Sequence, residues 1–441
     1  MRRTPLDPAT SSDSAQSQAL IDGADGKPRT RRQPFFELSY REARGHAIVA
    51  AILLWVGVAV MLVAGSSRQS VIGPLKGGDF VHFYTLGRLA LAGQGDELYD
   101  ASAQHALQTS LVPESASMQF LVPAYPPQVA LLFAPLALAP YGVALALWLG
   151  VIVCVYVGVL ELVRRHAFDD FRDRVFLAAA VLGFPPFVQL LLHGQTTVIP
   201  LLAFALGWLA LEHGRPYVAG MAFGLLAAKP NLGLLLAAVA LACREWRVIL
   251  GGVVSTGIQF AIVLMVLGGT PLSLYARTLV SLPATRHLIE QKPYQWHSLV
   301  AITDLLPGSL STPVWAVGFV IVLALTVRAW KSGLPIAARM AVVVFGTVLV
   351  SPHLSIYDAT LAILPIAWIG AWVERHETSA RRRYWTIVYG LFVAYLFPIA
   401  AVITIQPSVF LVAWLFAFAS TLATVHTETR HSSTPVVNAT G

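Results

Sequence analysis

The chain has 441 residues, of which 56% are hydrophobic and only 12% are charged, and its formal net charge is +7. Its mean hydropathy is +0.67. Soluble globular proteins carry about 25% charged residues, so this composition excludes an ordinary cytosolic enzyme. It also excludes disorder over most of the length, because disorder requires low hydrophobicity. We therefore predict an all-α polytopic membrane protein, and the two cysteines, Cys154 and Cys243, exclude a disulfide framework.

Residues 1–45 are polar and without period, which predicts a flexible tail. The first apolar run begins too far from Met1 for a secretory signal, so we expect it to be an uncleaved span. We expect residues 46–425 to form an integral membrane domain and 426–441 a second tail. The apolar runs of that domain are about 46–66, 141–163, 175–192, 197–213, 247–268, 313–330, 338–351, 356–373, 384–404 and 408–425.

Two regions do not have the sequence pattern of a simple membrane-spanning helix. Residues 127–139 are short and flanked by prolines, and we expect them to dip into the membrane without crossing it. Residues 217–243 are split by Lys229-Pro230-Asn231, and we expect them either to cross twice or to form a re-entrant hairpin.

Charge then sets the topology. With the N-terminal tail in the cytoplasm, 23 of the 30 Lys and Arg residues fall on the cytoplasmic side, as the positive-inside rule requires. This arrangement predicts ten to twelve spans, both termini inside, and two long outer loops at about 67–126 and 269–312. The basic residues that do not fall on the cytoplasmic side are Arg68, Lys76, Arg88, Lys229, Arg277, Arg286 and Lys292.

The first outer loop contains an apolar pattern at helical spacing that begins at Phe80. It predicts a helix that lies in the membrane interface rather than crossing it. Asp79 directly precedes this helix and follows the pair Gly77-Gly78. Asp79 is either the N-cap of the helix or a general base held at the membrane surface, and the two roles are compatible.

Two polar motifs interrupt the apolar runs in the first half of the chain. Tyr125-Pro126-Pro127 is either the entry to a helix or a rigid wall of an active site, because proline restricts the chain on both sides. The stretch 193–196, His-Gly-Gln-Thr, is either a plain turn or a place where Gln195 presents its amide to a sugar or phosphate.

Three further candidates lie in the second half. Lys229 stands at a break inside an apolar hairpin, where packing does not explain a lysine, and its natural ligand is a phosphate. His353, in Ser351-Pro352-His353, could donate to a phosphate or a pyranose oxygen, and Asp358 follows close by; a satisfied polar turn is the alternative. His297 is a weaker candidate, and its neighbour Trp296 fits an interfacial aromatic belt.

Several chemistries lack a signature in the sequence. There is no GxxxxGK[ST] phosphate loop, no HExxH, no GxSxG and no paired Cys/His set. We expect no resident cofactor and no metal site in protein ligands, and leave open whether a divalent ion assists. No basic run is interleaved with exposed aromatic residues, so we expect no nucleic-acid partner.

Taken together, the polar motifs resemble the family 87 glycosyltransferases, which include polyprenyl-phosphate-mannose-dependent alpha-mannosyltransferases of bacterial envelopes. The order and spacing of the motifs carry the resemblance, which spans roughly 46–425. The motifs are Gly78-Asp79-Phe80, Gly93 with Leu98-Tyr99, Tyr125-Pro126-Pro127 with Pro135-Leu136, Gly194-Gln195, Lys229-Pro230, and Ser351-Pro352-His353 with Tyr357-Asp358.

The resemblance implies a GT-C-type helical bundle with its active site at the outer face of a bacterial plasma membrane. It implies a sugar on a polyprenyl phosphate as donor, and it maps the essential aspartate onto Asp79. The Lys-Pro and Pro-His elements map onto Lys229 and His353. The stretch 296–299 matches the family only loosely, which leaves the role of His297 open. The family does not fix the acceptor, which we expect to be an envelope glycolipid or glycan.

These residues predict a sugar transfer in which Asp79 takes the proton of an acceptor hydroxyl while Lys229 and His353 support the departing prenyl phosphate. Tyr125, Gln195, Asp358 and His297 complete the expected substrate-binding set. A single carboxylate base without an obvious nucleophile favours direct displacement with inversion. Two other readings stay open, namely a transporter or flippase of lipid-linked sugars and an assembly partner without activity. The sugar, the acceptor and the oligomeric state do not follow from the sequence.

Overall fold

The computed structural model describes residues 40–66, 68–70, 75–117, 124–167, 173–289, 295–376, 378–397, 402 and 404–432. In this part of the chain the regular structure is helical, and the only strand-like pairing is two isolated bridges, Gln69 with Leu75 and Trp296 with Ser355. The predicted all-α class is confirmed. The predicted tails lie largely outside the described residues, although the first helix begins at Tyr40 and the last one ends at Ser432.

The helices of the first half differ widely in length, from 3 residues in η3 to 27 in α6. In chain order they are α2 (Tyr40–Val63), α3 (Phe80–Leu91), η1 (Gly95–Tyr99), α4 (Ala101–Leu111), η2 (Pro113–Ser117), α5 (Gln128–Phe133), η3 (Leu136–Leu138), α6 (Tyr141–Ala167), α7 (Arg174–Leu182), α8 (Pro185–His193) and α9 (Val198–Glu212).

The second half contains the hairpin and the C-terminal bundle. Its helices are α10 (Pro216–Phe223), η4 (Gly224–Ala228), η5 (Pro230–Leu232), α11 (Leu234–Ala242), α12 (Trp246–Leu267), α13 (Thr270–Ile289), α14 (Val300–Thr303), α15 (Gly308–Trp330), α16 (Ile336–Val350), η7 (Asp358–Ala362), α17 (Ile363–His376), α18 (Thr378–Leu396) and α20 (Pro407–Ser432).

Fewer helices are long enough to span a membrane than the ten to twelve that the apolar runs predict. Among the described residues, four helices qualify by length and composition, namely those at 41–63, 141–167, 246–267 and 308–330, and the bent pair α7 and α8 would make five. Other predicted spans are apolar but short: α9 and α16 have 15 residues each. The difference arises because polar or proline-containing breaks divide several runs. The protein is nevertheless a multi-pass membrane protein.

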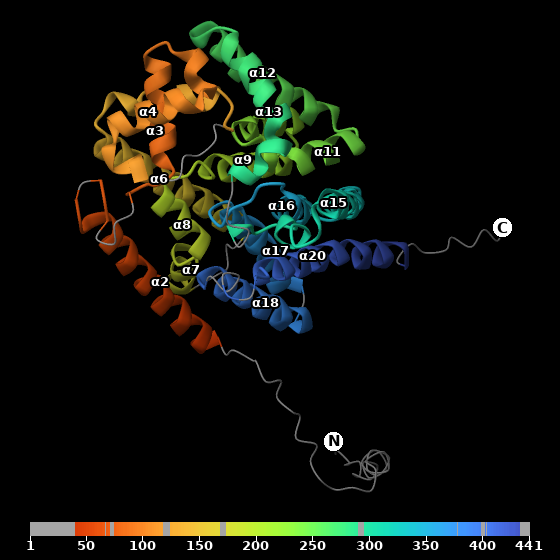
Figure 1. Ribbon diagram of the computed structural model, residues 1–441. Coiled ribbons are helices and arrows are strands. Elements are labelled where there is room, and N and C mark those ends of the chain that lie inside the picture. The colour runs from red at the N-terminus through yellow and green to blue at the C-terminus, as the bar shows by residue number, and fades with distance from the viewer. Residues whose placement is uncertain are drawn as a thin grey trace, which may run out of the picture. The chain divides into compact units, whose positions relative to one another are not determined.

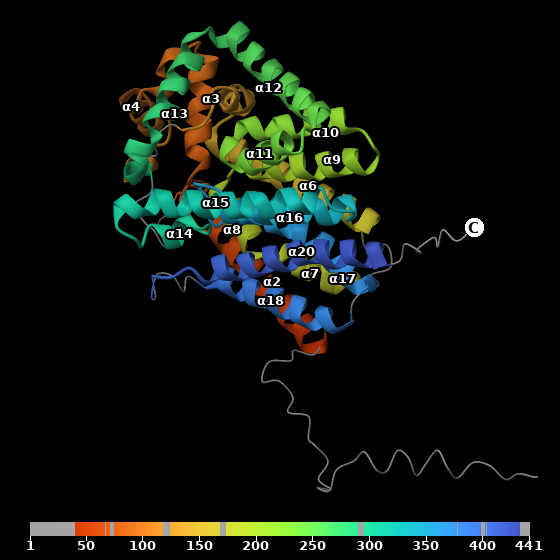
Figure 2. The ribbon, with the colours of Figure 1, turned by 90° about the vertical axis from the view of Figure 1, so that its right-hand side faces the viewer.

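The long helices carry the surface that lipid would contact. Large apolar side chains are exposed along α2, α12 and α15, including Leu53 on α2, Met265 on α12 and Val317 on α15. A soluble monomer rarely exposes so much contiguous apolar surface, whereas a membrane protein needs it. Figure 2 shows α12 running along one margin of the helices and α15 lying alongside α16.

The bend between α7 and α8 has a local cause. The two helices meet at 48°. Pro185 begins α8 and lacks a backbone N–H, so the hydrogen-bond ladder of α7 cannot continue through it. Trp55 of α2 donates its indole N–H to the carbonyl of Leu182 at this break, at 3.0 Å. In Figure 1, α2 runs beside α7 and α8.

Residues 216–242 break at Lys229 into two helical legs of 13 and 9 residues, which we term the hairpin, and each leg is too short to cross a bilayer alone. Its tip, at Lys229, contacts Thr197 at the start of α9. At the opposite end of α9, Glu212 accepts a hydrogen bond from the backbone N–H of Ala337, at 3.2 Å. The tip of the hairpin and the start of α9 therefore lie at the same end of the bundle.

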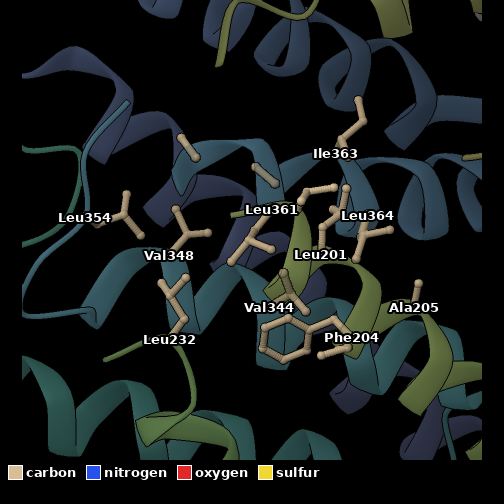
Figure 3. Close-up of a cluster of buried hydrophobic side chains, with 14 of the residues drawn as sticks. Leu201, Phe204, Ala205, Leu232, Val344, Val348, Leu354, Leu361, Ile363 and Leu364 are labelled. Carbon is tan, nitrogen blue, oxygen red and sulfur yellow. The ribbon is translucent and has the colours of Figure 1, made fainter. Parts of the chain in front are cut away.

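The core fills the space between α9, α16 and α17. Phe204 of α9 and Val344 of α16 are fully buried. Figure 3 shows them with Leu232 from the hairpin tip, and with Leu361 and Leu364 from the segment that follows α16. This packing holds four chain segments together, and they are α9, the hairpin tip, α16 and the segment that follows α16.

The helix that begins at Phe80 forms where the pattern predicts it, as α3, but it is packed differently. Ten of its 12 residues are buried in protein, whereas an interfacial helix keeps one face towards lipid and one towards water. Its polar residues are accommodated locally: Thr85 donates to the carbonyl of Val81 at 2.8 Å. The neighbouring helix α4 fits the interfacial pattern better, since most of its residues are exposed or half-buried.

Candidate active site

Two glycine-containing turns meet at Asp79. The backbone N–H of Asp79 donates to the carbonyl of His193 at 3.1 Å. Gly77 and Gly194 both have positive φ, 65° and 64°, which glycine adopts without strain. A Cβ atom on Gly194 would lie 2.8 Å from Cβ of Phe80, so the close approach of the turns also requires glycine there. Trp148 clamps the second turn by donating to the Gly194 carbonyl at 2.8 Å.

The Asp79 carboxylate is held on one side only. Asp79 occupies the N-cap position of α3, but its side chain makes no capping hydrogen bond. Instead, Nε2 of Gln195 donates to Oδ2 of Asp79 at 2.8 Å, and Oε1 of Gln195 accepts from the Tyr125 hydroxyl at 3.0 Å. Among the described residues, none donates to Oδ1. Asp79 is half-buried, so this second oxygen can be reached from outside the protein.

Lys229 and Asp358, expected as two separate substrate contacts, form an ion pair. Nζ of Lys229 lies 2.5 Å from Oδ1 of Asp358, and the side chains are 5% and 0% exposed. Thr197 donates to the same carboxylate oxygen at 2.5 Å. The backbone N–H of Ser355 lies 3.4 Å from Oδ2. Because Asp358 neutralises Lys229 within the protein, the lysine is not an isolated positive charge.

Aromatic rings join this ion pair to the Asp79 turn. The Lys229 ammonium lies 5.0 Å from the centre of the Tyr357 ring, a cation–π geometry. The Tyr357 ring in turn lies 5.6 Å from the imidazole of His193. Since the carbonyl of His193 binds the Asp79 backbone, these contacts make one continuous cluster from Asp79 to Asp358.

His353 lies in a loop that the hairpin tip fixes. The side-chain amide of Asn231 donates to the His353 carbonyl at 2.6 Å and to the Ser351 hydroxyl at 3.2 Å. The ring of Trp296 meets the imidazole of His353 edge to face, with centres 4.9 Å apart. His353 is half-buried and so retains a solvent-accessible part. Trp296 is 3% exposed, so it packs against His353 and is not part of a lipid-facing aromatic belt.

His297 makes its contacts in a different cluster. Its Nδ1 lies 2.8 Å from the Ser408 hydroxyl, and its ring packs against Tyr395. Its backbone N–H donates to the carbonyl of Leu354 at 2.9 Å, but no contact of its side chain reaches Asp79, Lys229 or His353 among the described residues. Burial lowers the pKa of His297 to about 3, so the ring is neutral at pH 7. These contacts fit a structural role better than the expected substrate contact.

Four residues of the cluster were not expected from the sequence: His82, Thr197, Asn231 and Trp148. Thr197 directly follows the 193–196 stretch and Asn231 belongs to the Lys229-Pro230-Asn231 break, so their position in the sequence could have indicated a role for them. His82 follows Asp79 by one helical turn, and burial lowers its pKa to about 4 although Asp79 acts in the opposite direction. A neutral imidazole therefore stands beside Asp79 at pH 7.

Six of the predicted site residues thus lie in one cluster that α3, α8, α9, the hairpin tip and the 351–358 segment build. It offers a half-exposed carboxylate, a half-exposed imidazole and a buried, neutralised ion pair. A carboxylate held on one oxygen can accept a proton on the other. In the described part of the chain, no three His, Cys, Asp or Glu side chains gather as metal ligands would.

Comparison with known proteins gives one match. A family model, glycosyltransferase family 87, matches residues 124–352, just over half of the chain. The matched range contains Tyr125, Gln195 and Lys229, whereas Asp79 lies before it and His353 directly after it. No curated protein and no solved structure matches the chain.

Proposed function

The chain belongs to glycosyltransferase family 87, and from this premise we propose that it moves a hexose from a polyprenyl phosphate to an envelope glycolipid or glycan. Mannose is the first candidate for the sugar, on the resemblance set out above. Family membership supports sugar transfer itself; the donor, the acceptor and the catalytic aspartate are the proposal. It also favours a transferase over the transporter, flippase or inactive partner considered from the sequence.

The proposal rests on the hydrogen bonding of the Asp79 carboxylate. Gln195 holds Oδ2 at 2.8 Å, while no described residue donates to Oδ1. A general base must lie within about 3 Å of the proton that it takes, and Asp79 is a half-buried residue with an oxygen that no described donor occupies. The same side chain is available for this role because it does not cap α3.

The reaction then balances as a single displacement. The acceptor hydroxyl loses its proton to Oδ1 of Asp79, and its oxygen forms a bond to the anomeric carbon. The bond from that carbon to the phosphate oxygen breaks, and the electron pair leaves with the prenyl phosphate. Attack from the face opposite the leaving group inverts the anomeric configuration. No nucleotide is required, because the phosphate leaves on its lipid.

The departing phosphate needs cationic support, and the cluster offers two groups. His353 is half-buried, and Asn231 fixes its loop, so it is the first candidate for a direct contact. Asp358 balances the charge of Lys229. Lys229 would therefore act on the phosphate mainly as a hydrogen-bond donor and less as a net positive charge. We therefore assign the main phosphate contact to His353 and a secondary, supporting role to the Lys229–Asp358 pair.

The proposed setting is a bacterial plasma membrane, with both termini in the cytoplasm and the cluster on the outer face of a GT-C-type bundle. The charge asymmetry supports this orientation, because 23 of the 30 Lys and Arg residues then lie inside. Membrane lipid would surround the exposed apolar faces of α2, α12 and α15.

Donor turnover tests the proposal. Wild-type protein and Asp79→Asn are placed in proteoliposomes with a panel of polyprenyl-phosphate sugars and a host lipid extract as acceptor source. Release of sugar from the prenyl phosphate by wild type, with at least a hundredfold loss in Asp79→Asn, is the expected result. Asp96→Asn is the matched control, because Asp96 lies exposed in the same outer segment and should retain activity. Equal turnover in wild type and Asp79→Asn would remove Asp79 as the base.

A further inference from the structure

The side-chain amide of Gln195 has an orientation that its neighbours determine. Its Oε1 accepts two hydrogen bonds, from the Tyr125 hydroxyl at 3.0 Å and from the backbone N–H of Thr196 at 3.1 Å. A backbone N–H can only donate, so the atom facing it must be the amide oxygen. The nitrogen therefore points the other way, to Asp79.

Tyr125 reinforces this orientation. Burial raises the pKa of Tyr125, so the phenol keeps its proton and can serve as a donor to Gln195. The ring is itself fixed, since it packs edge to face on Phe83 with centres 4.9 Å apart. The backbone carbonyl of Tyr125 also accepts from the Tyr99 hydroxyl at 2.8 Å.

Gln195 is too deeply buried to be a direct substrate contact. It is 3% exposed, and both ends of its amide already have partners within the protein. A sugar or phosphate that bound the amide would have to displace Tyr125 or Asp79. A buried polar group that loses its partner costs about 1 to 3 kcal/mol, so the existing contacts would resist displacement.

We propose that Gln195 is a positioning residue that engages Oδ2 of Asp79, leaves Oδ1 as the oxygen that takes the acceptor proton, and has its own amide oriented by Tyr125 and Thr196. The inference rests on the proposed role of Asp79 as base. It replaces the expectation that Gln195 and Tyr125 bind substrate directly. Tyr125 and Gln195 then act on the rate of the chemical step and leave donor binding nearly unchanged.

Replacement of the amide by a carboxylate of the same shape tests this role. In Gln195→Glu, a second carboxylate would face Oδ2 of Asp79, and the two would share a proton. Other titratable groups face this position, namely His82, Tyr125, Tyr141, Tyr357 and the Lys229–Asp358 pair, and they are unchanged in the variant. We expect kcat to fall at least tenfold at pH 7 and the low-pH limb of its profile to move up by one pH unit or more. The KM for the prenyl-phosphate donor should stay within twofold.

Tyr125→Phe gives a second, milder test that removes one hydroxyl. It removes one of the two donors that orient the amide and leaves Thr196 as the other, so kcat should fall several-fold while the donor KM is again unchanged. Gln189→Glu is the control, because it makes the same change on α8, just before the turn that carries Gln195, and the Gln189 side chain has no hydrogen bond to Asp79; its kcat profile should match wild type. Thermal unfolding in nanodiscs establishes that each variant is folded before its kinetics are compared.

Two outcomes would overturn the inference. One is a raised donor KM in Gln195→Glu with an unchanged kcat profile, since this would make Gln195 a substrate contact. The other is a wild-type kcat in both Gln195→Glu and Tyr125→Phe. Asp79→Asn, measured alongside, separates this failure from that of the proposed function: an inactive Asp79→Asn with an unaffected Gln195→Glu rejects the positioning role only, whereas an active Asp79→Asn rejects the base assignment.

Discussion

Nζ of Lys229 and Oδ1 of Asp358 lie 2.5 Å apart, and both side chains are almost completely buried. The two residues are 129 positions apart in the sequence, and their contact joins the tip of the hairpin to the segment after α16. Thr197 adds the start of α9 to the same contact. The ion pair therefore fixes the relative positions of three breaks in the helical structure.

Replacing one residue of this ion pair should destabilise the protein more than replacing both. Lys229→Met or Asp358→Asn alone leaves an uncompensated buried group, and we expect each to lower the free energy of unfolding by about 3 to 5 kcal/mol. The double variant should recover at least half of that loss, because neither charge remains. Denaturant titration in mixed micelles measures all three. Additive losses in the double variant would contradict a coupled pair.

Gly194→Ala should damage both stability and turnover. The added methyl group would lie 2.8 Å from Cβ of Phe80, at a residue with a φ of 64° that side chains rarely adopt. We expect a loss of roughly 1 to 2 kcal/mol from the backbone alone, and a larger one from the contact. Turnover should fall at least tenfold, because the same turn carries Gln195 and the carbonyl that binds the Asp79 backbone.

Gly150→Ala is the matched control for that variant. Gly150 lies inside α6 and a Cβ atom there would meet nothing within 4 Å. Alanine should leave turnover unchanged and add up to about 1 kcal/mol of stability, since glycine is unfavourable in a helix interior. Equal effects of the two substitutions would mean that the turn at Gly194 is not specifically strained.

Acidification should destabilise the protein through His297. Burial lowers the pKa of His297 to about 3, below the ordinary value of 6.5, and the groups that face it are the uncharged side chains of Ser408, Gln406 and Tyr395. As the pH falls, His297 takes up a proton in the unfolded chain before it does so in the folded protein. The stability that is present above pH 6.5 is therefore lost progressively as the pH falls towards 3. At pH 5 the loss from this residue is about 2 kcal/mol.

His297→Gln, which keeps a polar side chain but cannot titrate, isolates the contribution. The change in unfolding free energy between pH 7.5 and pH 5 should be smaller in this variant than in wild type, with the remaining slope owed in part to buried His82. An identical slope in both proteins would show that His297 is not the buried, neutral residue described here.

The sequence predicted single segments well and contacts between segments poorly. Hydropathy was sufficient for α6, α12 and α15, and the position of Lys229 at a break followed from the Lys-Pro pair. That Lys229 pairs with Asp358, and that Gln195 meets Asp79 across 116 positions, depends on packing that no local pattern encodes. The burial of α3 was missed for a related reason, since periodicity identifies an apolar face but does not say how many faces are covered.

The shortness of α9 has a consequence for the depth of the cluster. Its 15 residues rise about 22 Å between Glu212 and Thr197, whereas a hydrocarbon core is about 30 Å thick. With the Glu212 end at one surface, the Thr197 end stays several ångströms short of the other, below the lipid headgroups. The ion pair of Lys229 and Asp358, which Thr197 contacts, then lies at this depth, enclosed by protein. A prenyl phosphate that contacted this end of α9 would have to bring its charged end below the plane of the surrounding lipid headgroups.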